Sequence, residues 1–334
     1  MEKNYFIGMD VSKATLDVAI VVEKEVVYQQ QISNSSTGLK QCLKTLQKTL
    51  PEFDISRAVI CMEHTGIYNH HALSYLHSIG ADLCLESAVQ IKLSLGLQRG
   101  KNDRIDSVRI ARYAYKNREE LKFWQPKRSV VEELNRLTVL RDRLLQAKNQ
   151  LVVSYEEMRQ FDKSAATRVK ALSKSSMEAL ARDIDRVETA IEELIRQDEE
   201  LTRLFKLITS VQGIGKVTAA ALIVTTNEFK DIREAKPYAC YAGVAPFEHS
   251  SGIKKGRAGV SQKANKQVKC LLHMAALTAI VYNNDLRAYY ERKLKENKNK
   301  MVIINAVRNK LLHRVFSCVK RNTPYEKIYA SALV

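Results

Sequence analysis

The chain has 334 residues, 45% of them apolar, and carries 54 Lys and Arg against 37 Asp and Glu. This length and apolar content suffice for two domains with packed cores. No apolar run reaches membrane-spanning length, and the first four residues, Met-Glu-Lys-Asn, lack the plan of a signal peptide, so we expect a soluble cytoplasmic protein without a membrane partner.

The positive charge is concentrated in the C-terminal part. Residues 206–334 contain 23 Lys and Arg against 8 Asp and Glu, whereas residues 1–205 contain 31 against 29. Because Lys and Arg gain affinity by displacing counterions from phosphates, this distribution predicts a polyanionic partner, nucleic acid first. The alternative is a cationic surface that serves solubility alone.

The cysteines occur singly, without a C-x-x-C pair. We predict that they are buried small apolar residues in a reducing compartment and that they do not form a zinc site. They are Cys42, Cys61, Cys84, Cys240, Cys270 and Cys318.

The stretch Tyr5–Val22 predicts a β-hairpin, because an apolar run ends at Asp10, polar residues follow up to Thr15, and a second apolar run begins at Leu16. The residues around Asp10 predict burial, and burying a carboxylate costs roughly several kcal/mol unless a cation or donors meet it. Asp10 is therefore either a cap for the turn or a catalytic residue.

Strands and helices alternate after the hairpin. Ser35, Ser36 and Thr37 supply an N-cap, and the apolar run before Glu63 predicts a buried parallel strand. The order of the elements resembles that of a ribonuclease H-like α/β domain. The expected elements are a strand at Glu25–Ile32, a helix closed by Pro51, a strand at Arg57–Met62, a helix at Ile67–Ile79, a strand at Asp82–Glu86 and helical segments from Ala88 to about Tyr115.

Two acids end strands that are neighbours in such a sheet, Asp10 on the first strand and Glu63 on the fourth. Asp103 and Asp106 are three residues apart and share a face if their segment is helical. If the four carboxylates converge, they form the oxygen-only ligand set that Mg²⁺ prefers. Two such ions about 4 Å apart clamp the attacking and leaving oxygens of a phosphodiester.

Other polar residues near these acids leave two interpretations open. His64 is either a donor behind Glu63 or a loop histidine without a role. We set aside Asp17, Asp54 and Asp82, because solvent exposure or turn chemistry accounts for them. The nearby bases are either phosphate contacts or solvated helix faces, and they are Lys101, Arg104, Arg109 and Arg112.

Pro126 marks a boundary, because it breaks the preceding helix, and two long helices follow. Apolar residues in Met177–Leu201 fall on an alternating three-four spacing, interrupted only by Asp198, and Val130–Met158 repeats this heptad pattern less cleanly. We predict an antiparallel helical hairpin that bends near Lys163–Ser176. It serves either as a dimerisation arm or in packing within the chain.

Two motifs in the C-terminal part are suited to phosphate contacts. Gly213-Ile214-Gly215, followed by Lys216, resembles a helix-hairpin-helix turn, in which glycines let backbone N–H groups approach a phosphate. A plain tight turn is the alternative.

The second motif is Gly243–Gly259, which we call the serine loop, with Ser250-Ser251-Gly252 at its centre. Its serine is either a hydrogen-bond donor to phosphate or a nucleophile whose developing charge must be neutralised by nearby cations. The basic residues expected to contact nucleic acid are Lys254, Lys255, Arg257 and, beyond the loop, Lys263.

Five motifs, in this order and at these separations, resemble the bacterial DEDD transposases of the insertion-sequence one-ten family and the Piv DNA invertases. The resemblance covers nearly the whole chain. The motifs are Gly8-Met-Asp10-Val-Ser-Lys13, Glu63 with Gly66, Lys101-Asn-Asp103-Arg-Ile-Asp106, Gly213-Ile-Gly215 and the serine loop.

The resemblance implies a DNA transposase or site-specific recombinase of the bacterial cytoplasm, associated with the nucleoid when on DNA. It implies an α/β plus α architecture: a RuvC-like ribonuclease H-fold domain at 1–124, a coiled-coil helical hairpin at 125–205 and a basic, mostly helical transposase domain at 206–334. The family's acid tetrad maps onto the four acids as Mg²⁺ ligands. Its nucleophile, which forms a phosphoserine link, maps onto Ser251, with Ser250 as the fallback.

The resemblance also implies donor and target DNA, a structured noncoding guide RNA, and a homo-oligomer, dimer or tetramer, as partners. The alternative function is a metal-dependent, structure-specific nuclease related to junction resolvases, with water as the nucleophile. A third hypothesis is a structural protein that binds nucleic acid. The target site, the guide RNA, the subunit number, and the choice among integration, excision and inversion stay open.

Overall fold

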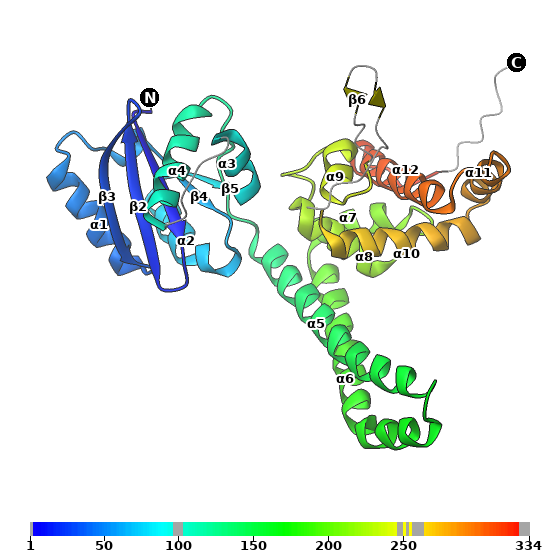
Figure 1. Ribbon diagram of the computed structural model, residues 1–334. Coiled ribbons are helices and arrows are strands. Elements are labelled where there is room, and N and C mark those ends of the chain that lie inside the picture. Colours follow the sequence, from blue (N-terminus) through cyan, green and yellow to red (C-terminus); the bar gives the residue numbers. More distant parts are fainter. Residues whose placement is uncertain (1–2, 96–102, 246–249, 252–253, 256–263, 327–334) are drawn as a thin grey trace, which may run out of the picture. The chain divides into compact units, whose positions relative to one another are not determined.

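The computed structural model describes residues 3–95, 103–245, 250–251, 254–255 and 264–326. It divides into two compact units, Met1–Pro126 and Lys127–Val334, which are described separately (Figure 1).

A five-stranded mixed sheet forms the first unit, with strand order β3-β2-β1-β4-β5. β1 (Tyr5–Val11), β2 (Thr15–Val22) and β3 (Glu25–Ser33) form an antiparallel meander. β4 (Ala58–Glu63) and β5 (Asp82–Glu86) run parallel to β1. The first and fourth strands are therefore neighbours, as the sequence predicted.

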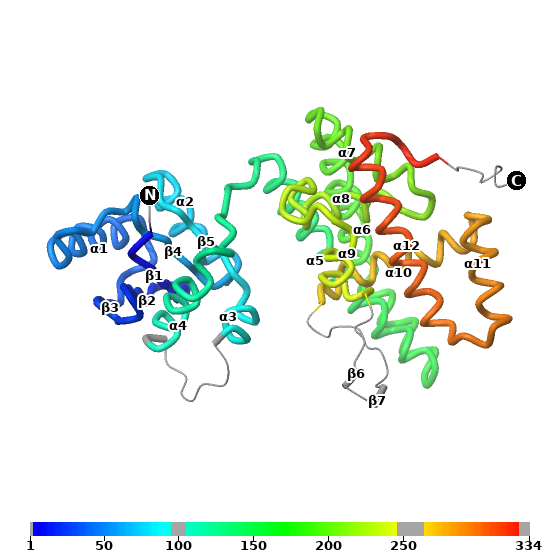
Figure 2. The backbone as a smooth tube through the Cα atoms, turned by 90° about the horizontal axis from the view of Figure 1, so that it is seen from above, coloured from blue at the N-terminus to red at the C-terminus, as the bar shows by residue number. Residues whose placement is uncertain are grey.

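Helices cover both faces of this sheet (Figure 2). Alternate β1 residues such as Ile7 and Met9 lie in the core with residues of α1 and α2, whereas Phe6 lies in the core with residues of α3 and α4. The helical elements of this unit are α1 (Ser36–Thr49), α2 (His70–Ser78), α3 (Ala88–Leu95) and α4 (Asp103–Lys116), with short 3₁₀ helices η1 (Ile55–Arg57) and η2 (Gly66–Asn69).

Three predictions can be compared with the structure here: two concern this unit, and the third concerns the cysteines of the whole chain. Ser35 caps α1 by accepting a hydrogen bond from the Gly38 amide, as expected. The helix predicted from Ile67 begins instead as η2 and becomes α-helical only at His70. Cys42, Cys61, Cys84 and Cys318 are buried, but Cys240 is half-buried and Cys270 is exposed, so the prediction of general burial was wrong for these two.

The second unit is helical among its described residues, apart from two short paired strands. The hairpin helices share its core, because Val131 and Leu134 pack with residues of α7, α8, α10 and α12. Its elements are α5 (Ser129–Met158), α6 (Lys163–Gln197), α7 (Glu199–Thr209), α8 (Lys216–Thr226), α9 (Ala235–Tyr241), β6 (Ser250–Ser251), β7 (Lys254–Lys255), α10 (Lys266–Tyr282), α11 (Asn284–Lys295) and α12 (Lys300–Arg321). No helix in the described part of the chain is both long and apolar enough to cross a bilayer.

The antiparallel hairpin is present, with Arg141 of α5 paired to Glu188 of α6 at 2.6 Å. Its turn was misplaced by the prediction. The connection is residues 159–162, and Asp162 caps α6 by accepting from the Ala165 amide, so the region predicted to bend, Lys163–Ser176, is helical. The coiled-coil assignment stays a prediction.

The predicted heptad seam does not run through Asp198. At this residue the backbone becomes extended, α6 ends, and the carboxylate caps α7 by accepting from the Leu201 amide at 2.9 Å. Aspartate is among the preferred N-cap residues, so this local bond competes with a continuous helix. Leu201 consequently belongs to the next helix.

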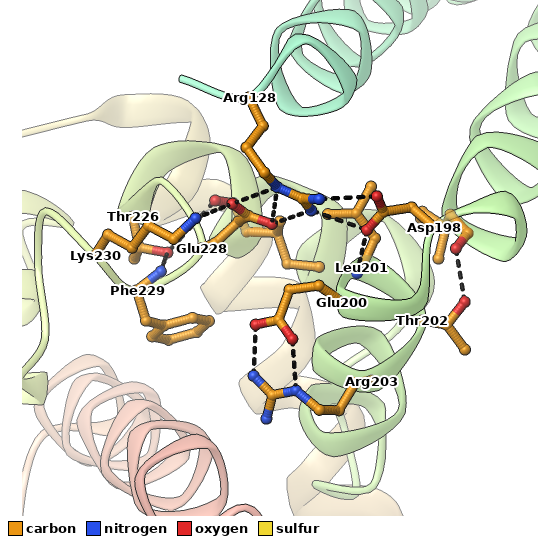
Figure 3. A network of polar contacts seen from close by, with 12 residues as sticks. Arg128, Asp198, Glu200, Leu201, Thr202, Arg203, Thr226, Glu228, Phe229 and Lys230 are labelled. Carbon is orange, nitrogen blue, oxygen red and sulfur yellow. Dashed lines mark hydrogen bonds and ion pairs between the residues drawn. The ribbon is translucent and has the colours of Figure 1, made fainter. Parts of the chain in front are cut away.

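Asp198 is also one end of an ion-pair network (Figure 3). The Arg128 guanidinium lies between Asp198, at 2.8 and 2.9 Å, and the Glu228 carboxylate, whose side chain is fully buried and also pairs with Lys230 at 2.7 Å. Asn227, Glu228 and Phe229 all have positive φ, between 49° and 61°, a costly conformation for residues other than glycine. The network thus fixes the start of α5 to the α6–α7 junction and to a strained turn after α8.

Candidate active site

Asp10 and Glu63 are next to each other at one edge of the sheet. The parallel register of β1 and β4 runs from Tyr5–Ala58 to Met9–Met62, so Asp10 and Glu63 are the next residues of the two strands. Side chains alternate between the two faces of a strand, so Asp10 lies on the same face as Phe6, and Glu63 lies on the same face as Cys61. Since Phe6 and Cys61 pack in the core with α4, both acids lie on the α4 face.

The start of α4 lies toward these acids. A Cβ on Gly8 would lie 2.1 Å from the Ser107 carbonyl oxygen and 2.3 Å from the Ala111 amide nitrogen, so helix and strand touch there. Phe6 lies against Tyr115, with ring centroids 5.2 Å apart. β1 and α4 therefore run in opposite senses, and the step from Gly8 to Asp10 leads toward the first turn of α4.

That first turn carries the other two predicted acids. Asp103 is the first residue of α4, and its side chain lies outside what the structure describes. Asp106 is partly exposed and pairs with Arg109 of the same helix at 2.7 Å. Arg109 is therefore an ion-pair partner of a candidate ligand, a role that neither alternative from the sequence had named.

Two further acids lie at the same edge, and the sequence interpretation missed both. Asp17 is the cross-strand partner of Asp10 and is only 4% exposed, so setting it aside as an exposed or turn residue was wrong. Its carboxylate accepts a hydrogen bond from the side-chain amide nitrogen of Gln31 at 2.9 Å. The sequence did contain a signal for this pairing. In a short hairpin that pairs residue 11 with 16, residue 10 is opposite residue 17.

The second missed acid is Glu86, the register partner of Glu63 on β5. It accepts hydrogen bonds from the Tyr113 hydroxyl at 3.0 Å and from the Ser87 amide at 2.9 Å. Burial, and then the nearby Glu86 carboxylate, raise the pKa of Tyr113, so its hydroxyl stays a neutral donor. Glu86 thus ties α4 to the edge strand.

The loop after Glu63 is held by a buried asparagine. Asn69, 1% exposed, donates to the Glu63 carbonyl at 2.9 Å and accepts from the Thr65 amide at 2.7 Å. His64 is exposed, and its Nδ1 accepts from the Gly66 amide, whose residue has φ +73°. His64 therefore stabilises its own turn, and the end of β4 has a defined position.

The chemistry of this edge suits a hard divalent cation. Its acids supply carboxylate oxygens from β1, β4 and the first turn of α4, and like charges this close oppose one another unless a cation lies between them. Within the described side chains, which exclude that of Asp103, no group of three or more His, Cys, Asp or Glu is close enough to hold a metal ion. The residues fit such an ion by type and by strand register.

The serines of the serine loop lie in the second unit. Ser250 and Ser251 form β6, which pairs antiparallel with β7, so that Ser250 lies opposite Lys255 and Ser251 opposite Lys254. The candidate contacts Arg257 and Lys263 lie outside the described residues.

The turn before α8 serves packing first. Gly213 has φ +102°, and a Cβ there would lie 2.6 Å from the Ala279 Cβ, so glycine is required for the approach to α10. Gly215 is the N-cap of α8 and has open space around it. Lys216 pairs with Glu192 of α6 at 2.6 Å, which reduces its availability to a phosphate.

Comparison with known proteins gives two matches to transposase families. Residues 7–158 match a DEDD transposase family of the IS110 type, described as "Transposase", and residues 205–291 match the "Transposase IS116/IS110/IS902 family". The chain is 28% identical to the pilin gene-inverting protein of Moraxella bovis, over 98% of this chain and 99% of that protein. It is 22% identical to the transposase for insertion sequence element IS1111A of Coxiella burnetii, over 96% and 90%.

The structure also matches a solved structure of T. thermophilus RuvC in complex with a Holliday junction substrate, with a TM-score of 0.27 and 14% identity, over 35% of this chain and 98% of that one. The family matches define the class: this is an enzyme of the transposase and recombinase type, which acts on DNA. More particularly, the chain belongs to the IS110 family of DEDD transposases.

Proposed function

We propose that this transposase cuts and rejoins DNA with two sets of groups, metal-bound carboxylates of a ribonuclease H-like first unit and a serine of the second. The observation that carries the proposal is the register of β1 and β4, in which Asp10 and Glu63 follow the pair Met9–Met62 on the face covered by α4. Carboxylates gathered there are suited to bind a divalent cation, and such a cation assists cleavage of a phosphodiester.

In this proposal Asp10, Glu63, Asp103 and Asp106 hold Mg²⁺. A bound divalent ion would neutralise the charge that develops on the attacked phosphate and on the leaving oxygen. The residues of the chain orient that site: Asn69 fixes the end of β4, and Gly8 allows α4 to lie directly on β1. Asp17 and Glu86 add negative charge beside the ligands.

Ser251 is the proposed nucleophile, with Ser250 as the fallback. Its hydroxyl oxygen loses a proton and bonds to the scissile phosphorus while one bridging P–O bond breaks. This leaves a phosphoserine ester on one DNA end and a free hydroxyl on the other. Attack by the hydroxyl of the incoming strand on the same phosphorus restores a phosphodiester and releases the serine oxygen. Lys254, across the β6–β7 ladder from Ser251, is suited to stabilise the phosphorane charge.

The basic second unit is proposed to bind donor and target DNA together with a noncoding guide RNA, in a homo-oligomer. Its excess of Lys and Arg over Asp and Glu supports a polyanionic partner. The residues proposed to contact the nucleic-acid backbone are Gly213, Gly215, Lys216, Lys254, Lys255, Arg257 and Lys263.

The test compares Ser251→Ala with Ser250→Ala in a bacterial host that carries the gene with its natural flanking DNA. We expect Ser251→Ala to abolish recombinant junctions and the covalent protein–DNA adduct, while nucleic-acid binding by the purified full-length protein stays within about twofold. Ser250→Ala serves as the matched control. Normal recombination by both variants would refute the serine mechanism.

One observation favours a second function. All the candidate ligands belong to the first unit, so hydrolysis of a phosphodiester by water would not require the serine loop. A metal-dependent, structure-specific nuclease would give cleaved, unlinked DNA ends in the Ser251→Ala protein, and would lose cleavage in Asp10→Asn.

A further inference from the structure

The second unit buries an arginine that pairs with no acid among the described residues. Arg308 of α12 is 5% exposed. Its guanidinium contacts His273 Nδ1 of α10 and lies 3.5 Å from the Asn305 side-chain oxygen, and its buried Nε has no hydrogen-bond partner. A buried cation is strongly unfavourable unless an anion compensates it.

The two helices that meet at Arg308 do not supply that anion. α10 and α12 contain no Asp or Glu. The helices α7 and α11, which also pack against α12, do contain acids, but no carboxylate of the described residues forms an ion pair with Arg308. Arg128 of the same unit shows the contrast, because two carboxylates contact it. A guanidinium is not deprotonated in proteins, so the charge of Arg308 persists although burial lowers its pKa.

His273 does not compensate the charge either. Burial, and then the charge of Arg308, lower the pKa of His273, so its ring is neutral at physiological pH and its Nδ1 accepts from the guanidinium. Lys269 precedes His273 by one turn of α10 and is half-buried. Within the described residues, the charged side chains of α10 and α12 are therefore all positive, a composition that suits an anion.

This cluster lies beside the described beginning of the serine loop. Asn305, one turn before Arg308 on α12, donates to the Val244 carbonyl at 2.7 Å. At the other end, Asn265 caps α10 and donates to the Tyr241 carbonyl at 2.9 Å. α10 and α12 pack against each other, so the described start of the loop segment is anchored next to the Arg308–His273 contact.

We propose that Arg308, His273 and Lys269 form an anion site at the base of the serine loop, and that its occupant is a phosphate of the nucleic-acid backbone. The inference rests on the proposed function, in which this loop acts on DNA. A phosphate bound here provides the negative charge that compensates Arg308. It also holds the nucleic-acid strand at the base of the loop that carries the proposed nucleophile. Two planar N–H groups of a guanidinium suit two phosphate oxygens.

The test is Arg308→Met in the full-length protein, with Arg308→Lys as a second variant and Lys310→Met as the matched control, since Lys310 is exposed on the same helix. In phosphate-free buffer Arg308→Met should unfold at the same temperature as the wild type or higher, because methionine removes an uncompensated buried charge. Recombination should fall about a hundredfold, and Arg308→Lys should retain part of it. Lys310→Met should change neither.

Inorganic phosphate provides a readout that is independent of catalysis. It should raise the Tm of the wild type and of Lys310→Met by about 2–4 °C more than that of Arg308→Met. Two binding measurements identify which nucleic acid supplies the phosphate, one with duplex DNA and one with a transcript of the flanking noncoding DNA. The affinity for one of the two should fall about tenfold or more in Arg308→Met.

Three results would overturn the proposal. One is a loss of stability in Arg308→Met as large as in Arg128→Met, and another is equal protection of all variants by phosphate. The third is coupling in a double-mutant cycle with Glu248→Gln, since Glu248 is the only acid in the sequence between 246 and 263 and would then be the partner. If Ser251→Ala recombines normally, the proposed function fails, but the phosphate readout still decides the anion site.

Discussion

The first unit gathers carboxylates at one edge of its sheet, whereas the second unit buries a guanidinium among helices without acids. The two places collect charged groups of opposite sign. Neither arrangement is explained by stability, because a neutral or apolar residue would fold as well or better. We propose binding as the reason for both, of a divalent cation at the sheet edge and of a phosphate beside α12.

The Arg128 network shows what a charge that serves folding looks like in the same chain. Its guanidinium is matched by two carboxylates, one of them fully buried, and Asp198 also caps a helix. Comparing compensated with uncompensated charges therefore separates structural from functional residues, and the following variants test that distinction.

Asp10→Asn should have the largest effect. Removing one carboxylate of the proposed metal site should reduce recombination more than about 10³-fold. The metal would stabilise the transition state by several kcal/mol, and each loss of about 1.36 kcal/mol lowers the rate tenfold. Added Mg²⁺ should raise the Tm of the wild type more than that of the variant, because the variant has lost one proposed ligand. Thermal unfolding with and without Mg²⁺ checks the second statement, and retained activity would remove Asp10 from the mechanism.

Gly8→Ala should have the next largest effect, on stability. The new Cβ would lie 2.1 Å from a backbone oxygen of α4, so the helix must shift, at a cost of about 3 kcal/mol. Because α4 carries Asp103 and Asp106, activity should fall as well. Gly215→Ala, at a position with open space, is the control for urea unfolding. Equal stability of the two variants would contradict the close approach of β1 and α4.

Arg128→Met should destabilise the second unit by about 2 kcal/mol, because buried Glu228 loses its main partner. Arg128 also holds the pKa of Asp198 below its usual range. The stability that Asp198 contributes is therefore complete above about pH 4 and is lost as the pH falls through its lower folded-state pKa.

Acid titration of unfolding checks this linkage. The stability of the wild type should fall more steeply than that of Arg128→Met below about pH 4. A parallel dependence in both proteins would show that the ion pair is not what lowers the pKa of Asp198.

Asp17→Asn should have the smallest effect of the four. Asp17 lies beside the proposed ligand Asp10, so its removal should weaken metal binding about tenfold without abolishing chemistry. Activity measured against Mg²⁺ concentration should recover at high metal concentration, unlike that of Asp10→Asn. A variant that cannot be rescued would make Asp17 a ligand itself.

Local patterns in the sequence predicted the elements of the first unit well. The strand Asp82–Glu86 has the predicted bounds, and Ser35 caps α1. Predictions failed where two local preferences competed: Asp198 interrupts an apolar repeat with a cap, and Asp162 places the hairpin turn before the region predicted to bend. Single-residue caps decide such boundaries, and periodicity does not report them.

By itself the sequence determined the family and predicted which residues carry the chemistry, because carboxylates, serines and basic residues occur in ordered motifs at separations that resemble a known family. Only the tertiary structure decided which charged groups come together and which are buried. Asp17 and Glu86 lie beside Asp10 and Glu63 through strand register, and Arg308 is buried where α12 meets α10, two helices that contain no acid. Register and helix packing join residues far apart in the chain, and compensation of charge depends on those distances in space.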